Sequence, residues 1–359
     1  MLNLYRLNPI VRNNFKEENT MKSFFTVLIA FITALTTVMS GGELADELNN
    51  KGTILGYSQT HTVQKELPDL YADENGDFTI LQVSDTHFTT GITFCDLNLM
   101  NKIKKLVNKY DPDLVFISGD MLDDGNDGKF NKAYVLRTVA EYFEEADQYW
   151  AYVPGNNDNR NYGTSEDITA YLLQYDHCLV SDVPEISGGA QYSVDIVDKG
   201  TAAHSLIFLD SMDYDKADPD HKYGYIHEDQ VNWCKQEIDS KKVENEDITV
   251  SVMMHENTPA FDNAAKQGEA YKFGFPEVIA STKANRIPKN QPLDDVLAQS
   301  DCVGLVTIGH VHPATAQCSF YENTYYHIAP QAIVASTLIT IHTREDSVRD
   351  MYDFDSLYY

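Results

Sequence analysis

Short runs of apolar residues recur along the middle of the chain, each bounded by polar residues or glycine. They cover residues 79–83, 114–117, 249–254 and 303–308. Strands that are buried on both faces of a sheet have this pattern. We therefore predict a buried strand at each of these four places.

Amphipathic stretches separate the first of these strands. In 96–110 the apolar residues recur at nearly helical spacing, and we expect Asp96 to cap this helix. A second helix is predicted at 132–146, ahead of a strand at 149–153. Strand and helix thus alternate twice, which predicts neighbouring parallel strands.

The pattern changes after residue 190. Apolar and polar residues alternate in 192–197, and 205–210 follows a turn that contains glycine, so these two segments are predicted to pair antiparallel. The stretch 257–291 is long and rich in Lys, Asn, Phe and Gly, and is expected to form a loop that walls a substrate cleft. The other expected elements are a helix near 229–238 and strands around 324–328 and 332–342.

The length and composition favour one large domain. The chain has 359 residues, is 43% hydrophobic, and shows neither an internal repeat nor a Pro/Ser-rich linker. We place the domain at 73–345, after a polar lead-in segment at 41–72 and before an acidic, aromatic C-terminal tail at 346–359.

Residues 1–40 are interpreted as an N-terminal extension and a signal peptide. Lys22 precedes an apolar run at 24–39, and small residues allow cleavage after Ser40. The run is short for a membrane span, although a retained signal anchor is the alternative. We therefore expect a secreted or endomembrane-lumen protein whose signal peptide spans approximately 21–40, with no stable membrane anchor after cleavage.

Charge and cysteine content limit the partners and the covalent structure. A formal charge of −28 repels nucleic-acid backbones and anionic membranes. The five cysteines lack a Cys-x-x-Cys metal spacing. In an oxidising compartment Cys302 and Cys318 are the first pair to test for a disulfide, and five free thiols are the other possibility.

Metal-ligating side chains stand just after several of the predicted strands. In open α/β folds the carboxyl ends of strands carry the site, and Asp, Asn and His together suit a pair of hard cations. Singly, such residues are ordinary caps, turns or buried histidines, but the joint pattern favours a site. The segments are Asp85-Thr86-His87, Gly119-Asp120, Gly155-Asn156-Asn157-Asp158, His255 and Gly309-His310-Val311-His312.

In this order the five segments resemble the calcineurin-like metallophosphoesterase superfamily, and the resemblance covers about residues 77–343. It implies an α/β fold in which two mixed β-sheets pack as a sandwich flanked by helices, in four αββα layers. It also implies a dinuclear-metal-dependent phosphoesterase that hydrolyses phosphate esters with a metal-activated hydroxide. The sequence departs from the family at one position, where Asn157 replaces a histidine.

The resemblance also assigns the ligands. Asp120 would bridge two divalent or trivalent ions, with Fe, Zn and Mn all suitable. One ion would take Asp85, His87 and His312, and the other Asn156, His255 and His310. The purple, tyrosinate-iron subtype carries a tyrosine a few residues after this Gly-Asp pair, and Leu122, Asp123 and Asp124 stand there instead.

The expected catalytic residues are Asp120, Asn157, Asp158 and His255. In the family the histidine at position 157 protonates the leaving oxygen and the next acidic residue orients it, whereas Asn157 cannot deliver a proton. Asn157 and Arg160 are the candidates for binding a phosphate oxygen of the substrate, and an ordinary salt bridge is the alternative for Arg160. Histidines that could replace the acid are His177, His204, His221, His227 and His327.

The substrate class stays open at this point. A phosphorylated small molecule and a phosphoprotein are both compatible, as are monoesters and diesters. A metal-binding pseudoenzyme that acts as a binding protein is the alternative function, because a positioned general acid is missing.

Overall fold

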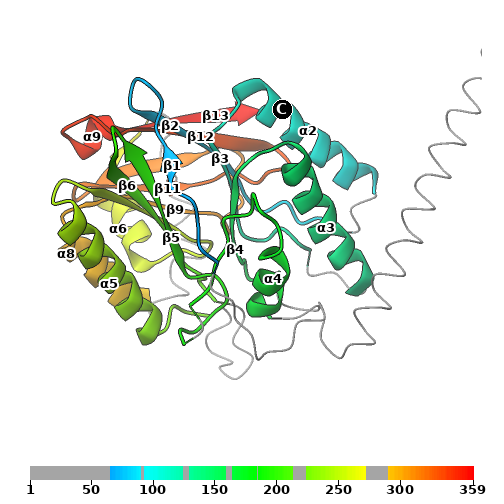
Figure 1. Ribbon diagram of the computed structural model, residues 1–359, viewed down its shortest axis with the longest axis horizontal. Coiled ribbons are helices and arrows are strands. Elements are labelled where there is room, and N and C mark those ends of the chain that lie inside the picture. Colours follow the sequence, from blue (N-terminus) through cyan, green and yellow to red (C-terminus); the bar gives the residue numbers. More distant parts are fainter. Residues whose placement is uncertain are drawn as a thin grey trace, which may run out of the picture.

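Two mixed β-sheets face each other, and helices cover their outer sides (Figure 1). The computed structural model describes residues 65–89, 93–123, 129–158, 164–183, 185–212, 224–271 and 290–359. The predicted fold class, a sandwich of two mixed sheets flanked by helices, is confirmed.

The five-stranded sheet contains the predicted alternation of strands and helices. Its strand order is β13-β12-β2-β3-β4, in which β2, β3 and β4 are parallel to one another. Its elements and the helices near it are β2 (Asp77–Val83), α2 (Phe94–Tyr110), β3 (Leu114–Ser118), α3 (Lys129–Glu145), β4 (Trp150–Val153), α4 (Ser165–Leu172), β12 (Ala335–His342), α9 (Val348–Met351) and β13 (Tyr352–Tyr358).

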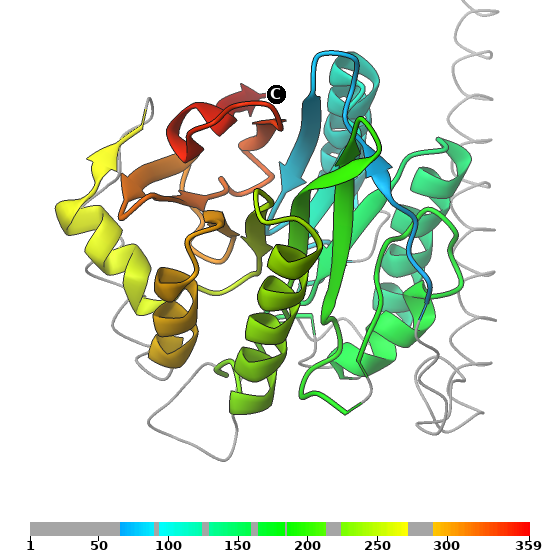
Figure 2. The same ribbon diagram turned by 60° about the vertical axis from the view of Figure 1, so that its left-hand side comes forward.

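The eight-stranded sheet has the order β1-β5-β6-β7-β9-β11-β10-β8. The predicted antiparallel pairing of β5 with β6 is confirmed, and β6, β7 and β9 run parallel. Helices α5 and α8 lie side by side near this sheet (Figure 2). The elements are β1 (Leu70–Tyr71), β5 (Tyr192–Asp198), β6 (Thr201–Phe208), α5 (Glu228–Glu244), β7 (Thr249–Met253), α6 (Pro259–Gln267), β8 (Glu269–Ala270), α8 (Gln291–Gln299), β9 (Val303–Ile308), β10 (Gln317–Tyr321) and β11 (Thr324–Ile328).

The core lies between the sheets. The ring of Phe116 on β3 meets that of Phe208 on β6 edge to face, with centroids 5.4 Å apart. Polar side chains also cross the interface, since the hydroxyl of Thr307 on β9 donates to Gln82 on β2 at 2.7 Å. All the strand residues of β3 and β9 are buried, which explains their continuous apolar sequences.

Helix α2 begins earlier than predicted. Its N-cap is Thr93, whose hydroxyl accepts a hydrogen bond from the backbone N–H of Asp96 at 3.1 Å. Threonine and aspartate are both favoured caps, so the sequence offered two candidates three residues apart. Asp96 instead lies in the first turn, where its charge favours the positive end of the helix dipole.

The C-terminal segment 346–359 is not a tail outside the domain. It contains α9 and β13, and β13 pairs antiparallel with β12 along its whole length. Phe354 is fully buried, which explains the aromatic residues there. Alternation with Asp353 and Asp355 made this edge strand resemble an acidic tail.

Two further expectations change. The stretch 257–291 contains α6 and β8, and 272–289 lies outside the described residues.

The cysteines are free thiols. Cys302 adjoins β9 and Cys318 lies on β10, and β11 separates these strands. Strands are about 4.8 Å apart, so the two are too distant for a disulfide.

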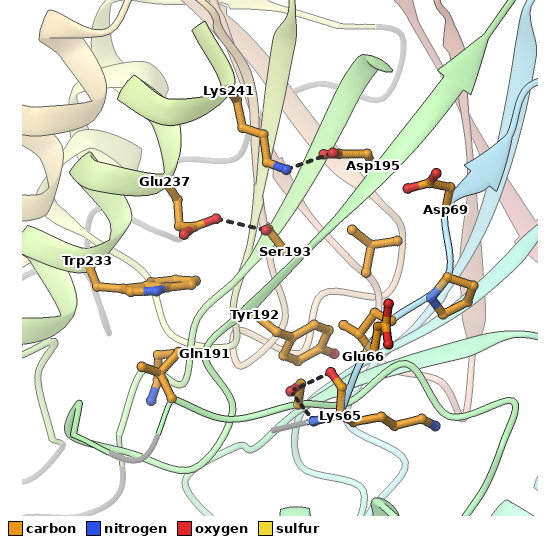
Figure 3. A pocket seen from close by; sticks show the side chains of 15 residues that line it. Lys65, Glu66, Asp69, Gln191, Tyr192, Ser193, Asp195, Trp233, Glu237 and Lys241 are labelled. Atoms are coloured by element: carbon orange, nitrogen blue, oxygen red, sulfur yellow. Dashed lines mark hydrogen bonds and ion pairs between the residues drawn. The ribbon is translucent and has the colours of Figure 1, made fainter. Parts of the chain in front are cut away.

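The polar lead-in segment contributes to the fold. Leu70 and Tyr71 form β1 on β5, and the ammonium group of Lys65 donates to the carbonyl oxygens of Tyr175 and Cys178 at 2.7 and 2.8 Å. Residues 65–69, β5 and α5 line a cavity of about 530 Å³ (Figure 3). The predicted signal segment lies outside the described residues, among which no helix has the length and apolarity needed to span a membrane.

Candidate metal centre

Five turns meet where parallel strands end. They follow β2, β3 and β4 in one sheet and β7 and β9 in the other, so the candidate ligands gather at one end of the sandwich. The side chains form two groups whose ligand atoms lie within 4.8 Å of one another, and Asp120 belongs to both. The groups are Asp85, His87, Asp120 and His312, and Asp120, His255 and His310.

The first group is closely spaced and partly open to solvent. Nε2 of His312 lies 2.8 Å from Oδ1 of Asp85 and 3.0 Å from Nε2 of His87. Nε2 of His87 is 3.8 Å from Oδ2 of Asp120. The imidazoles of His87 and His312 are 20% and 34% exposed, whereas the carboxylate of Asp85 is buried. Solvent or a substrate would therefore approach from the histidine side.

The second group is buried and oriented by the backbone. Nδ1–H of His255 donates to the carbonyl oxygen of Ser118 at 2.7 Å, which directs Nε2 toward the centre. Such a bond to the second ring nitrogen is the usual support of a metal-ligating histidine. Nε2 lies 3.5 Å from Oδ1 of Asp120 and 3.3 Å from Oδ1 of Asn156. Asn156 thus adjoins this group, as its predicted role requires.

The electrostatics indicate a place for a cation. Burial lowers the pKa of His255, but the carboxylates of Asp120 and Asp85 outweigh it and raise that pKa to about 10. The pKa of Asp120 is lowered because His255 and His87 outweigh the effect of its burial. In the protein without ions, a proton on His255 occupies a position where a metal would compete with it.

The backbone of the centre is unusual. In the described part of the chain eleven non-glycine residues have positive φ, and five of them are candidate ligands. Left-handed conformations are uncommon for such residues and concentrate at functional sites. These ligands are Asp85 (54°), His87 (45°), Asp120 (48°), His310 (64°) and His312 (59°).

Glycines in two of the motifs make room for the ligands. A Cβ at Gly119, whose φ is +83°, would lie 2.3 Å from Nδ1 of His255. A Cβ at Gly155 would lie 2.2 Å from the backbone nitrogen of Asp120. The loops after β3 and β4 therefore approach each other, and the imidazole after β7, more closely than any larger residue permits.

Asn157 bonds to the shared carboxylate. Its backbone N–H and its side-chain Nδ2 donate to the two oxygens of Asp120 at 2.8 and 2.5 Å. The residue that replaces the family's histidine therefore holds Asp120 in place. Arg160, the other predicted substrate-binding residue, lies outside the described residues.

Asp158 has a different place from the one we predicted. It is fully buried, and Oδ1 accepts from the N–H of Leu122 at 2.7 Å. Oδ2 accepts from the N–H of Gly155 and from the hydroxyl of Tyr152, at 2.8 and 2.9 Å. Burial and the charge of Asp120 raise the pKa of Asp158 to about 7. These bonds fix the loop and leave Asp158 no orienting role toward residue 157.

The described histidines proposed as replacement acids lie away from both groups. His204 and His327 are buried on β6 and β11, and burial lowers the pKa of each to about 3. His177 pairs with Glu144 beside the start of β4, and His227 precedes α5. His221 lies outside the described residues.

Three supporting residues carried no sequence signal that we used. The hydroxyl of Ser84 donates to Oδ2 of Asp85 at 2.6 Å. Ser118 orients His255 through its backbone carbonyl, a role open to any residue type. In the sequence Tyr152 has the pattern of an ordinary buried strand residue, although its hydroxyl donates a hydrogen bond to Asp158. Only the position of Ser84 and Ser118 beside the Asp85 and Gly-Asp motifs could have marked them.

The sequence model of the calcineurin-like phosphoesterase family matches residues 78–314, which is more than half of the chain. The chain belongs to this family.

Two named plant proteins resemble part of the chain in sequence. The chain is 27% identical over 196 residues to a protein of Arabidopsis thaliana named probable inactive purple acid phosphatase 28, covering 45% of this chain and 48% of the relative. It is 26% identical over 186 residues to probable inactive purple acid phosphatase 29 of the same plant, covering 44% and 46%. The chain thus spans about half the length of these relatives.

A dimetal phosphatase from Danio rerio shares the fold. The structures align with a TM-score of 0.50 at 12% identity, over 79% of this chain and 99% of that one. At this identity the likeness concerns the fold alone.

Proposed function

We propose that the protein is a dinuclear-metal-dependent phosphoesterase. The observation that carries this proposal is the pair of ligand groups that share Asp120, in the partition expected for two ions. Asp85, His87 and His312 would hold one ion, and Asn156, His255 and His310 the other. Imidazole and carboxylate oxygen suit Fe, Zn or Mn.

Bound ions would supply the positive charge and the nucleophile for an in-line attack on phosphorus. The protein residues orient that chemistry. Ser118 fixes the ring of His255, and Asn157 fixes both oxygens of Asp120. The exposed edges of His87 and His312 mark the side from which a substrate phosphate would enter.

The missing acid favours esters with good leaving groups. Asn157 can donate a hydrogen bond to a phosphoryl oxygen, but it has no proton to transfer to an alkoxide. A positioned general acid contributes about 10²–10⁴-fold. Aryl esters and diesters with one good leaving group are therefore better substrates for this site than unactivated alkyl phosphates.

A second candidate function is metal binding without turnover. It is supported by the same Asn157 and by the names of the two plant relatives, which call them probable inactive purple acid phosphatases. In that case the ions stabilise the fold, and the centre serves as a binding surface.

One experiment separates these functions. The purified protein is analysed for metal content and assayed with p-nitrophenyl phosphate and bis-p-nitrophenyl phosphate, with added Mn, Zn or Fe. Two equivalents of metal and a turnover that Asp120→Asn abolishes are expected for the enzyme. Bound metal without turnover, and an Asp120→Asn variant that only melts at a lower temperature, would instead establish the binding protein.

We also propose that the protein is secreted or resides in the endomembrane lumen. The support is the charged and apolar layout of residues 21–40. Amino-terminal sequencing of the mature chain tests this, and a start near Gly41 is expected. A mature chain that keeps residues 24–39 would show a membrane anchor instead.

A further inference from the structure

We infer that Tyr152 is a positioning residue for the metal centre, which acts through Asp158 to set the affinity of the ion beside Asn156. This inference rests on the proposed dinuclear site. It concerns a buried side chain on β4 that the expected ligand set does not include. A chain of hydrogen bonds runs from Tyr192 through Tyr152 to Asp158.

The first link joins Tyr152 to the ligand loop. Its hydroxyl and the N–H of Gly155 donate to the same oxygen, Oδ2 of Asp158. Asn156 is the next residue after Gly155, so this shared oxygen anchors the turn that presents the Asn156 amide. All three groups are buried, where an unmade hydrogen bond costs more than in water.

The second link fixes Tyr152 itself. β4 is an edge strand of its sheet, and on its outer side Trp150 pairs with the segment around Cys178, whereas Tyr152 has no described strand beside it. The hydroxyl of Tyr192 takes that place, because it accepts from the N–H of Tyr152 at 3.0 Å and donates to its carbonyl oxygen at 2.8 Å. Tyr192 belongs to β5, so one hydroxyl ties the two sheets together behind the centre.

Tyr192 also lies at the wall of the cavity lined by Lys65 and Trp233 (Figure 3). Its ring stacks on Phe208 with centroids 4.5 Å apart, so it has little freedom to turn. The support of the ligand loop thus starts from a rigid aromatic pair in the core.

The two oxygens of Asp158 predict a selective effect. Oδ1 holds Leu122, two residues beyond the shared ligand Asp120, and Oδ2 holds Gly155 beside Asn156. Tyr152 bonds only to Oδ2. Loss of its hydroxyl should therefore disturb the ion beside Asn156, whose other ligands are His255 and His310, and spare the ion held by Asp85, His87 and His312.

The test is a metal titration of the full chain after removal of ions by a chelator. Mn²⁺ binding is measured by calorimetry in a His312→Ala background, which isolates the ion beside Asn156, and in a His310→Ala background, which isolates the other. For Tyr152→Phe we expect Kd to rise about 10–100-fold in the first background, as is typical for a lost supporting bond, with no change in the second.

Tyr142→Phe is the matched control. The Tyr142 hydroxyl is buried and has no hydrogen-bond partner within the described part of the chain, so its removal should leave both Kd values unchanged. A Tyr152→Phe protein that melts earlier but binds both ions normally would reduce Tyr152 to a structural role and overturn the inference. An equal loss at both ions would overturn it as well.

If Tyr152→Phe does not fold, Tyr192→Phe replaces it. This variant acts one bond further away and should raise the Kd of the same ion by a smaller factor; an unchanged Kd would refute the inference. No ester enters these measurements. An inactive protein whose Kd still responds to Tyr152→Phe would therefore refute the proposed turnover and keep the positioning role.

Discussion

At the scale of the single residue, Asn157 decides how the centre can react. Its backbone N–H and its side-chain amide both bond to Asp120, and an amide has no proton that it can transfer to a leaving group. Among the described histidines that could have replaced the acid, His204 and His327 bond to Ser251 and Thr307 within the sheet, and His177 pairs with Glu144. If the proposed function holds, turnover at this site would therefore depend on the leaving group.

Asn157→His should restore a general acid. Hydrolysis of an alkyl phosphate should rise by up to about 10²–10⁴-fold, and hydrolysis of a p-nitrophenyl ester much less, since a nitrophenolate leaves without a proton. The measurement is kcat for both esters under saturating metal. Asn157→Gln is the control, because it keeps an amide and should give no gain. An equal rise for both esters would argue against proton transfer from His at 157.

Gly119 is a second residue whose role the structure makes testable. Gly119→Ala would combine a left-handed φ with a contact at 2.3 Å to His255, and should cost about 3 kcal/mol or more of unfolding free energy. Gly200→Ala has nearly the same φ, +84°, with nothing within 4 Å, so it should cost only about 1–2 kcal/mol. Urea unfolding of both variants measures the difference. Equal costs would show that the contact with His255 is easily relieved.

At the scale of the element, the sequence predicted well where one pattern dominates. β9 and β11 begin and end at the predicted residues, and α3 and β4 are displaced by only a few residues. The prediction failed at β13, whose alternating Asp and aromatic residues fit an exposed tail as well as an edge strand. Which of these forms depends on the pairing with β12, a contact that no local pattern contains.

Phe354→Ala tests whether β13 is integral to the fold. The ring is fully buried and stacks on His327 with centroids 5.1 Å apart, so its loss should cost about 3–5 kcal/mol. Asp355→Ala, on the exposed face of the same strand, should change stability by less than about 0.5 kcal/mol. Urea unfolding measures both. A Phe354→Ala protein as stable as the wild type would show that residues 346–359 are not an integral part of the fold.

At the scale of the whole molecule, topology makes the site. The motifs could be predicted because each follows a strand, and a resemblance supplied their partition between two ions. The sequence could not show that Asp158 would turn toward Leu122 and Gly155, because that depends on how the loops after β3 and β4 approach each other. The link from Tyr192 to Tyr152 likewise exists only because the two sheets meet there.

The response of the whole fold to pH follows from buried groups of opposite kind. Burial lowers the pKa of His204 and of His327 to about 3, below the 6.5 of an exposed imidazole. Their contribution to stability is therefore complete above about pH 6.5 and is lost as the pH falls toward 3. Burial raises the pKa of Asp294 to about 7, above its usual 3.8, so its contribution is complete below 3.8 and is lost as the pH rises through 7.

Two variants separate these contributions, and each is compared with the wild type because the opposing slopes partly cancel. In chelator, the unfolding free energy is measured by urea between pH 4.5 and 8. His204→Asn should remove up to about 1.4 kcal/mol of acid destabilisation per pH unit below pH 6.5. Asp294→Asn can still accept the N–H of Ala260, bonded at 2.8 Å, and its stability relative to the wild type should rise between pH 4.5 and about 7 and stay level above that. If the difference in unfolding free energy between each variant and the wild type is the same at every pH, these groups are solvated in solution. The core around β6 and at the start of α6 would then be more open than its packing indicates.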